Sequence, residues 1–180
     1  MKITVITGSP HRKGTSALLA DRFIDGAKES GHHVFRFDAA FENLHSCLGC
    51  DRCGSTGKCI HKDGIENLIP HLKESDLVVF VTPLYYFGMS AQLKTVIDRF
   101  YSVNYELMGK RKKAMLMATA YDDKEWTFEA LENHYLTIVK YLEWKNAGIL
   151  LAGGCGDRGT IERSIYPEKA YKMGKNITDL

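Results

Sequence analysis

Apolar residues along this chain form short runs that alternate with stretches in which they recur every three or four positions. The runs are rich in β-branched residues and end in Thr, Asp or Ala, which is typical of strands buried on both faces. The longer stretches place their apolar residues on one helix face. We expect strands at residues 2–7, 33–38, 76–82, 114–120 and 146–152, and helices at residues 15–30, 64–74, 90–103, 125–144 and 164–175.

This alternation predicts an α/β fold. Strands separated by helices pair in parallel through right-handed crossovers, so we expect a doubly wound five-stranded sheet with helices on both faces. At 180 residues the chain is close to the size of one domain, and we expect residues 1–180 to form one domain. The irregular residues at about 40–63 form a cysteine-rich insertion. Ligands of such sheets bind beyond the carboxyl ends of the strands, so the loops that follow the strands are the candidates for chemistry.

The loop at residues 8–16 links the first strand to the first helix and carries glycines and hydroxyls. Such a loop suits a phosphate held on the free N–H groups at the helix start. It is not a P-loop, because five residues separate its glycines and Thr15 follows the second. A G-x-G-x-x-G run is also absent, so Asp38 at the end of the second strand gives only weak support for NAD binding. The alternative is a plain turn in which Thr15 or Ser16 caps the helix.

The loop at residues 82–90 is apolar and aromatic although it follows a buried strand. It offers a stacking wall for a flat heteroaromatic ring, and Gly88 lets the backbone come close to a ligand. The alternative is that its aromatic side chains pack into the core or against another subunit. Small residues after the fourth and fifth strands also allow a close approach, and we expect Cys155 there to be an inert packing residue. A phosphate loop and an aromatic loop together fit a mononucleotide with a planar head, which is flavin mononucleotide (FMN).

Charge and hydropathy narrow the choice of partners. The formal net charge of +2 gives no reason to expect nucleic acid, and the basic run at residues 110–113 is expected to be a solvated loop. No apolar run approaches the length of about 20 residues that a membrane span needs. The first residues lack a signal-peptide pattern, so we expect a cytoplasmic protein.

Four of the five cysteines fall within thirteen residues. Cys47, Cys50, Cys53 and Cys59 have the spacing C-x2-C-x2-C-x5-C, and four thiolates are enough for one [4Fe–4S] cluster. Zinc is the alternative, although structural zinc sites with four thiolates usually use two C-x2-C pairs with a longer spacer. The histidines are scattered and are expected to be surface or packing residues, apart from His11 in the first loop. The sequence shows no paired carboxylates and no Ser–His–Asp set that would indicate acid–base catalysis, so we expect a cofactor to supply the chemistry.

Several stretches together resemble the NAD(P)H-dependent FMN reductase family of flavodoxin-like proteins. These are Gly8-Ser9-Pro10, Gly14-Thr15-Ser16, residues 83–94 and Asp98-Arg99. The four-cysteine motif is similar to that of the iron–sulfur flavoproteins, a branch of the same group. The resemblance implies a flavodoxin-like sheet of strand order 2-1-3-4-5 and an FMN cofactor.

The resemblance also implies which residues bind FMN. The phosphate would be held by Ser9, His11, Gly14, Thr15 and Ser16. The isoalloxazine would lie against Pro83, Leu84, Tyr85, Tyr86, Phe87 and Gly88, with Thr119, Ala120 and Tyr121 on its other side. The four cysteines at 47, 50, 53 and 59 would bind the [4Fe–4S] cluster.

Three functions remain in competition. The first is an oxidoreductase that takes electrons from NAD(P)H through FMN and passes them to a small acceptor. The second is an iron–sulfur flavoprotein that exchanges electrons with ferredoxin-like partners, and the third is a cysteine-rich regulatory or zinc-binding module without flavin. Trp126, Tyr141 and Trp144 lie off the main stripe of their helix, and residues 40–62 have little packing of their own. We therefore expect a homodimer or homotetramer with the flavin near the interface.

Overall fold

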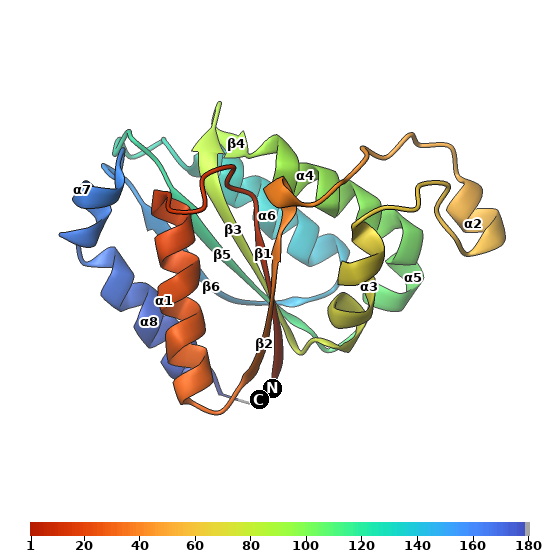
Figure 1. The fold of residues 1–180 in the computed structure, drawn as a ribbon, viewed down its shortest axis with the longest axis horizontal. Helices are drawn as coiled ribbons and strands as arrows, with labels where there is room; N and C mark the ends of the chain where they lie inside the picture. Colours follow the sequence, from red (N-terminus) through yellow and green to blue (C-terminus); the bar gives the residue numbers. More distant parts are fainter. Residues whose placement is uncertain (179–180) are drawn as a thin grey trace.

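A computed structural model describes residues 1–178 and shows a parallel sheet with helices on both faces (Figure 1). The parallel strands are β1 (Lys2–Thr7), β2 (His33–Asp38), β3 (Leu77–Tyr85), β5 (Lys113–Thr119) and β6 (Lys145–Ala152). Their order across the sheet is β2-β1-β3-β5-β6. Counted over the parallel strands, this is the predicted order 2-1-3-4-5, so the predicted fold class is confirmed. The additional strand β4 (Gly88–Met89) pairs antiparallel with the end of β3.

The helices form two layers. The α-helices are α1 (Thr15–Glu29), α2 (Arg52–Thr56), α3 (Ile65–Glu74), α4 (Ala91–Asp98), α5 (Asn104–Leu107), α6 (Glu129–Tyr141), α7 (Arg158–Glu162) and α8 (Tyr166–Lys175). Two 3₁₀ turns are η1 (Ala39–Phe41) and η2 (Arg99–Val103). In Figure 1, α1, α7 and α8 cover one face of the sheet, and α3, α4, α5 and α6 lie on the other.

Each face of the sheet contributes to a separate apolar core, because successive strand residues point to opposite faces. On the α4 side, Ile6 and Phe80 pack in a cluster with Leu93. On the α1 side, Val5 and Val79 pack in a cluster with Leu19. The central strand β3 is buried from Leu77 to Pro83, which explains its continuous apolar run.

Helices α1 and α8 are in close backbone contact through glycines. A Cβ added to Gly26 would lie 2.1 Å from the carbonyl oxygen of Tyr171, and one added to Gly174 would lie 2.1 Å from that of Phe23. Neither position has room for a side chain, so these two glycines set the distance between the helices.

Several predicted helices are shorter or divided. The helix expected at 90–103 ends at Asp98 and continues as η2 and α5, and the one expected at 125–144 spans only Glu129–Tyr141. Residues 40–63 include the short helix α2 and are not irregular throughout. The last helix begins at Tyr166, since Pro167 lies in its first turn, and α7 precedes it with Asp157 as its N-cap.

The basic run at 110–113 is a solvated loop only in its first half, where Lys110 and Arg111 are exposed. Lys113 begins β5, and Lys112 is buried with its Nζ donating to the carbonyl oxygens of Lys73 (2.7 Å) and Ser75 (2.5 Å). Burial lowers the pKa of Lys112 below its ordinary value. The ammonium group therefore ties the start of β5 to the end of α3.

The three aromatic residues expected at a subunit interface differ in exposure. Trp144 is buried within the chain, and its indole N–H donates to the carbonyl oxygen of Leu107 at 2.8 Å. The prediction that Trp144 is available for contact with another subunit was therefore wrong. Trp126 and Tyr141 are exposed. Within residues 1–178, no helix combines the length and the apolar character needed to cross a membrane.

Candidate functional site

A cavity of about 640 Å³ opens at the carboxyl ends of the strands, where the fold predicts a ligand. The three predicted loops after β1, β3 and β5 line it, together with the loop after β6. Its lining residues are Ser9, Pro10, His11, Arg12, Lys13, Gly14, Thr15, Pro83, Leu84, Tyr85, Thr119, Ala120, Tyr121, Cys155, Gly156, Asp157 and Arg158. This volume lies within the usual range for small-molecule and cofactor sites.

The first loop leaves the N-terminus of α1 without a side-chain cap. The N-cap residue is Gly14, and the first turn contains no acidic residue. The alternative that Thr15 or Ser16 caps the helix is therefore wrong, and the first N–H groups of α1 have no intrahelical acceptor. Such an N-terminus attracts an anion, because its free N–H groups and the helix dipole act together.

Hydroxyl groups organise this loop and join it to its neighbours. The Oγ of Ser9, which is buried, accepts a hydrogen bond from the backbone N–H of His11 at 3.1 Å. The hydroxyls of Thr15 and Thr119 are hydrogen-bonded at 2.9 Å and link the loops after β1 and β5 across the cavity.

The first loop also contacts the start of α4 directly. The Oγ of Ser90 donates to the carbonyl oxygen of Gly8 at 2.8 Å and accepts from the N–H of Leu93 at 3.4 Å as the N-cap of α4. A Cβ on Gly8 would lie 2.3 Å from that Oγ. A glycine is therefore required for the first loop and the aromatic loop to lie so close together.

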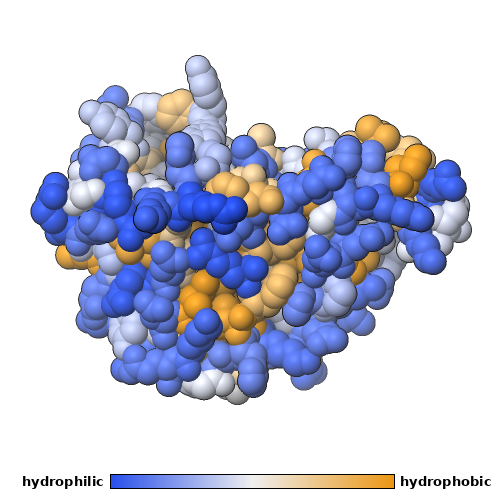
Figure 2. Space-filling model, in the orientation of Figure 1, coloured by the Kyte–Doolittle hydropathy of each residue, from blue (hydrophilic) through white to orange (hydrophobic). Residues whose placement is uncertain are grey.

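The aromatic loop is a tight hairpin between β3 and β4. Tyr85 pairs with Gly88, and the two residues between them, Tyr86 and Phe87, have φ angles of 45° and 62°. Two positive φ angles in a two-residue loop are usually supplied by Asn and Gly, so bulky aromatic residues there are strained. The side chain of Tyr86 is fully exposed, and the hairpin projects from the molecule in Figure 2. Strain of this kind is concentrated at functional sites.

The structure brings together ten of the fourteen residues expected at the flavin site. Ser16, Tyr86, Phe87 and Gly88 do not line the cavity. Ser16 is buried in α1. The ring centroids of Phe87 and Trp126 are 5.1 Å apart.

Arg158 also lines the cavity, beside the first loop, and was not among the residues predicted from the sequence. Its Nη1 donates to the carbonyl oxygen of Gly14 at 3.4 Å, and its Nε to Glu162 at 2.6 Å. The glycine-rich loop before it was a weak signal for this position. Cys155 in that loop is buried, as expected, and burial raises the pKa of its thiol.

The four clustered cysteines lie in a segment that projects from the body of the protein. We refer to residues 46–62 as the cysteine segment; it includes α2, seen at the far end of the molecule from α8 (Figure 1). Cys47 and Cys50 are exposed, whereas Cys53 and Cys59 are half-buried. Apolar residues gather at this end of the molecule in Figure 2, where Leu48 and Ile60 are exposed.

The cysteine side chains are not gathered around one point. Within residues 1–178, no three side chains of His, Cys, Asp or Glu are placed so that they could hold one metal ion. The donor atoms have the right chemistry for a [4Fe–4S] cluster, but their present arrangement does not form its ligand set.

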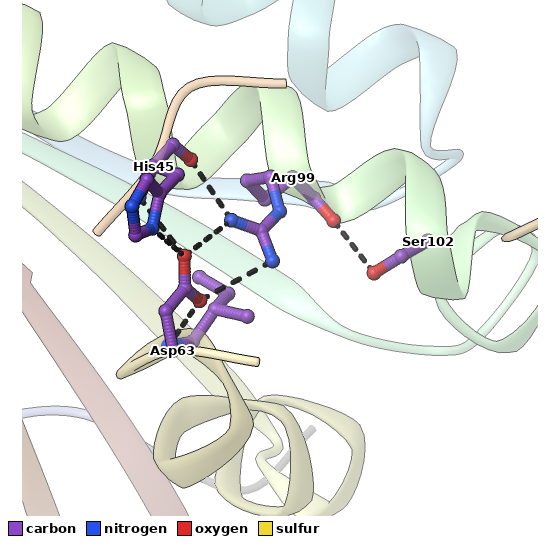
Figure 3. A network of polar contacts seen from close by, with 5 residues as sticks. His45, Asp63, Arg99 and Ser102 are labelled. Carbon is purple, nitrogen blue, oxygen red and sulfur yellow. Dashed lines mark hydrogen bonds and ion pairs between the residues drawn. The ribbon is translucent and has the colours of Figure 1, made fainter. Parts of the chain in front are cut away.

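A buried ion pair closes the base of the cysteine segment (Figure 3). Arg99 Nη1 lies 2.8 Å from Asp63 Oδ2 and donates to the carbonyl oxygen of His45 at 2.8 Å. The backbone N–H of His45 donates to the same carboxylate at 2.9 Å. The side chains of Arg99 and Asp63 are 1% and 0% exposed. We call His45, Asp63 and Arg99 the clasp.

The contacts within the clasp favour the charged forms of Asp63 and Arg99. Burial by itself would raise the pKa of Asp63, but hydrogen bonds from Arg99 and from the N–H groups of His45 and Ile65 hold it well below its usual range. Burial would lower the pKa of Arg99, but Asp63 and the neighbouring Cys59 raise it. The pair is therefore ionised at neutral pH.

Comparison with known proteins gives one family match. The model of a family described as NADPH-dependent FMN reductase matches residues 1–146. An iron–sulfur flavoprotein of Methanocaldococcus jannaschii is 30% identical over 187 residues, which cover 100% of this chain and 97% of that protein.

Other relatives match over a smaller part of their length. An iron–sulfur flavoprotein of Archaeoglobus fulgidus is 33% identical over 112 residues, or 61% of this chain and 51% of that protein. Among solved structures, the NAD(P)H:quinone oxidoreductase from Methanothermobacter marburgensis aligns with a TM-score of 0.78 over 99% of this chain and 96% of that one. Its identity is 20%, so this similarity concerns the fold alone.

Proposed function

The chain belongs to the NADPH-dependent FMN reductase family, and we propose from this that its cavity binds FMN and that the protein passes electrons from NAD(P)H to a small acceptor. The observation that carries the proposal is the uncapped N-terminus of α1 at the cavity, which has no acidic residue in its first turn. A phosphate monoester satisfies the free N–H groups that the chain itself leaves without an acceptor.

The chain's own residues would orient the cofactor from both ends. Ser9 and Thr15 offer hydroxyl groups to the phosphate, and the strand ends at Pro83–Tyr85 and Thr119–Tyr121 enclose the other part of the cavity. FMN, when bound, supplies the transfer of a hydride from NAD(P)H and the release of its electrons to an acceptor. The protein then needs to provide position and electrostatics.

The first test is FMN titration followed by anaerobic addition of NADPH. We expect a one-to-one complex whose yellow colour is bleached by NADPH and returns when a quinone is added. In Ser9→Asp, a negative charge occupies the place of the phosphate, and we expect loss of FMN binding. Ser55→Asp changes an exposed serine of the cysteine segment and should bind FMN normally. A Ser9→Asp protein that keeps stoichiometric FMN would contradict the phosphate assignment.

As a second candidate function we propose an iron–sulfur flavoprotein, in which the cysteine segment binds a [4Fe–4S] cluster. Two observations favour it: four thiols lie within thirteen residues, and a relative aligned over nearly its full length carries that name. The thiols would have to come together, since their present arrangement does not form a ligand set. Iron, sulfide and zinc analysis of anaerobically purified protein separates a cluster from a zinc site, and absence of all three contradicts both.

We further propose that the protein acts in the cytoplasm as a homodimer or homotetramer, and that its partners, if a cluster is present, include ferredoxin-like proteins. The exposed aromatic side chains of Trp126 and Tyr141 support an assembly. Residues 1–180 would then form one domain with the cysteine-rich insertion at about 40–63. Mass measurement in solution tests the assembly, and a monomer at micromolar concentration would exclude it.

A further inference from the structure

A second cavity, of about 300 Å³, lies beside the first loop. This cavity and the candidate flavin site are both lined by three residues of that loop, Ser9, His11 and Arg12. The rest of the second cavity is formed by α1, the ends of β1 and β2, and η1. We call it the side pocket, and its chemistry depends on Arg12, Arg36, Asp38 and Phe41.

The side pocket lies where a sheet of this kind binds ribose. Asp38 ends β2, and its register partner Thr7 ends the neighbouring parallel strand β1. In dinucleotide-binding α/β sheets, an acidic residue near this point accepts a hydrogen bond from a ribose hydroxyl, and an arginine nearby accommodates a 2′-phosphate. Asp38 lines the side pocket and not the candidate flavin site, so it is in the side pocket that this carboxylate is open to a ligand.

Asp38 is held in place with one carboxylate oxygen left over. Its Oδ1 accepts hydrogen bonds from the Oγ1 of Thr7 at 2.6 Å and from the Nε of Arg36 at 2.7 Å. The Nη1 of Arg36 donates to Asp21, which does not line the pocket, at 2.5 Å. These contacts fix the carboxylate and the guanidinium, and they leave Asp38 Oδ2 and Arg36 Nη2 for a ligand.

Arg12 is the cation of the side pocket that has no counter-charge. Its guanidinium carbon lies 3.7 Å from the centroid of the Phe41 ring, and it forms no ion pair within residues 1–178. A guanidinium stacked on an aromatic ring keeps its N–H donors at its edge, where they bind phosphate in a bidentate manner. Asp38 and Asp21 offset the charge of Arg36, so the charge of Arg12 remains to attract an anion.

We propose that the side pocket binds the adenosine ribose of NADPH with its 2′-phosphate, that Arg12 selects NADPH over NADH, and that Phe41 is the positioning residue of Arg12. The 2′-phosphate accepts hydrogen bonds from Arg12 and from the Nη2 of Arg36. Asp38 Oδ2 accepts one from the 3′-hydroxyl group of the same ribose. The inference rests on the proposed function and adds which end of the electron donor is recognised, and where.

The place of the side pocket agrees with this role. The first loop is the wall that the two cavities share, and α1 begins at its end. With the phosphate of FMN on the N-terminus of α1, a dinucleotide whose nicotinamide reaches the flavin crosses this loop, and its adenosine end enters the side pocket. Recognition at that end supplies binding energy remote from the reacting ring.

The first test measures binding without turnover. FMN-loaded and FMN-free protein are each titrated calorimetrically with adenosine 2′,5′-bisphosphate and with adenosine 5′-monophosphate. We expect the wild type to bind the bisphosphate about tenfold more tightly or better, which is the effect of one hydrogen bond to a charged group. In Arg12→Ser we expect the two nucleotides to bind alike, with the Kd for FMN unchanged. Arg111→Ser removes an exposed arginine before β5 and is the matched control, with all three affinities unchanged.

The second test compares turnover with NADPH and with NADH at saturating quinone. Phe41→Ala removes the ring that holds Arg12, and the fold should tolerate it because Phe41 is 39% exposed. We expect the KM for NADPH to rise several-fold, while the KM for NADH and both kcat values stay the same. A merely structural role of Phe41 would affect turnover with the two donors equally.

Three outcomes overturn the proposal. One is a wild-type chain that binds the bisphosphate no better than the monophosphate. Another is an Arg12→Ser protein that loses affinity for FMN but keeps its preference for the bisphosphate, and the third is a Phe41→Ala protein whose KM rises equally for both donors. Failure to bind FMN contradicts the proposed function alone, because the titration of FMN-free protein tests the side pocket by itself.

Discussion

Gly8 is the residue at which the loop after β1 meets the N-terminus of α4. A Cβ there would lie 2.3 Å from Ser90 Oγ and 2.7 Å from Leu93 Cβ. We expect Gly8→Ala to lower the free energy of unfolding by about 1–3 kcal/mol, the usual cost of overpacking, and to weaken FMN binding. Urea unfolding and FMN titration measure the two effects.

Gly159→Ala is the matched control for that change. Its added Cβ would approach only the carboxylate of Asp157, at 3.3 Å, and the flexible end of Arg163. The free energy of unfolding should stay within a few tenths of a kcal/mol or rise slightly. Equal changes in the free energy of unfolding for Gly8→Ala and Gly159→Ala would show that Gly8 and Ser90 are not closely packed.

Asp63 gives the molecule a defined dependence on pH. Its pKa is lowered in the folded protein, so its stabilising effect is complete above its ordinary value of 3.8 and is lost as the pH falls toward the lower folded value. We expect Asp63→Asn to lower the free energy of unfolding by about 3–5 kcal/mol at pH 7, because Arg99 is left buried without its partner.

The pH series supplies the check on this assignment. Urea unfolding at several pH values should show the difference between wild type and Asp63→Asn shrinking as the pH falls below 3.8 toward the lower folded value, because the unfolded carboxylate of the wild type is protonated there while the folded one is still ionised. Asp25→Asn removes an exposed carboxylate and should have little effect at any pH. A constant difference between wild type and Asp63→Asn across the series would contradict the lowered pKa.

At the scale of elements, the β3–β4 hairpin carries a strained two-residue turn. Tyr86 has a φ of 45° and a fully exposed side chain, so its replacement removes no buried surface. Asn adopts left-handed angles more readily than Tyr, and we expect Tyr86→Asn to raise the free energy of unfolding by about 1 kcal/mol. Thermal unfolding measures this gain.

Tyr105→Asn changes a similarly exposed tyrosine on α5, in an ordinary helical position, and should bring no gain. We also expect Tyr86→Asn to slow turnover with NADPH and a quinone, because the turn directly follows Tyr85, which lines the cavity. If stability rises and turnover is unchanged, the strain has no part in the redox function.

At the scale of the whole molecule, the bound cofactor should stabilise the fold. The cavity is built from loops after four different strands, so the folded state binds FMN and the unfolded chain does not. At 100 times its Kd, FMN should add about 2.7 kcal/mol to the free energy of unfolding, and Ser9→Asp should abolish this gain. Thermal unfolding with increasing FMN measures it, and a midpoint independent of FMN would contradict the assigned site.

The layered architecture and most of the cavity could be predicted from the sequence. Strand positions were close to correct because buried strands are continuous apolar runs, and ten of the expected flavin-site residues line the cavity because loops after parallel strands meet at one edge. Helix ends were less accurate. The helix expected to reach residue 103 ends at Asp98, where Arg99 turns toward Asp63, a partner 36 positions away.

The sequence by itself determined the alternation of strands and helices, the loops that carry the candidate chemistry and the presence of four thiols in one segment. These follow from local periodicity and spacing, whereas the strand order was implied by the resemblance to a known family. Only the tertiary structure decided that Lys112 is buried, that Arg158 reaches a loop 145 residues away, and that Arg99 and Asp63 form a buried ion pair at the base of the cysteine segment. Each depends on which distant groups become neighbours when water is excluded, and the pattern of a single chain does not encode those distances.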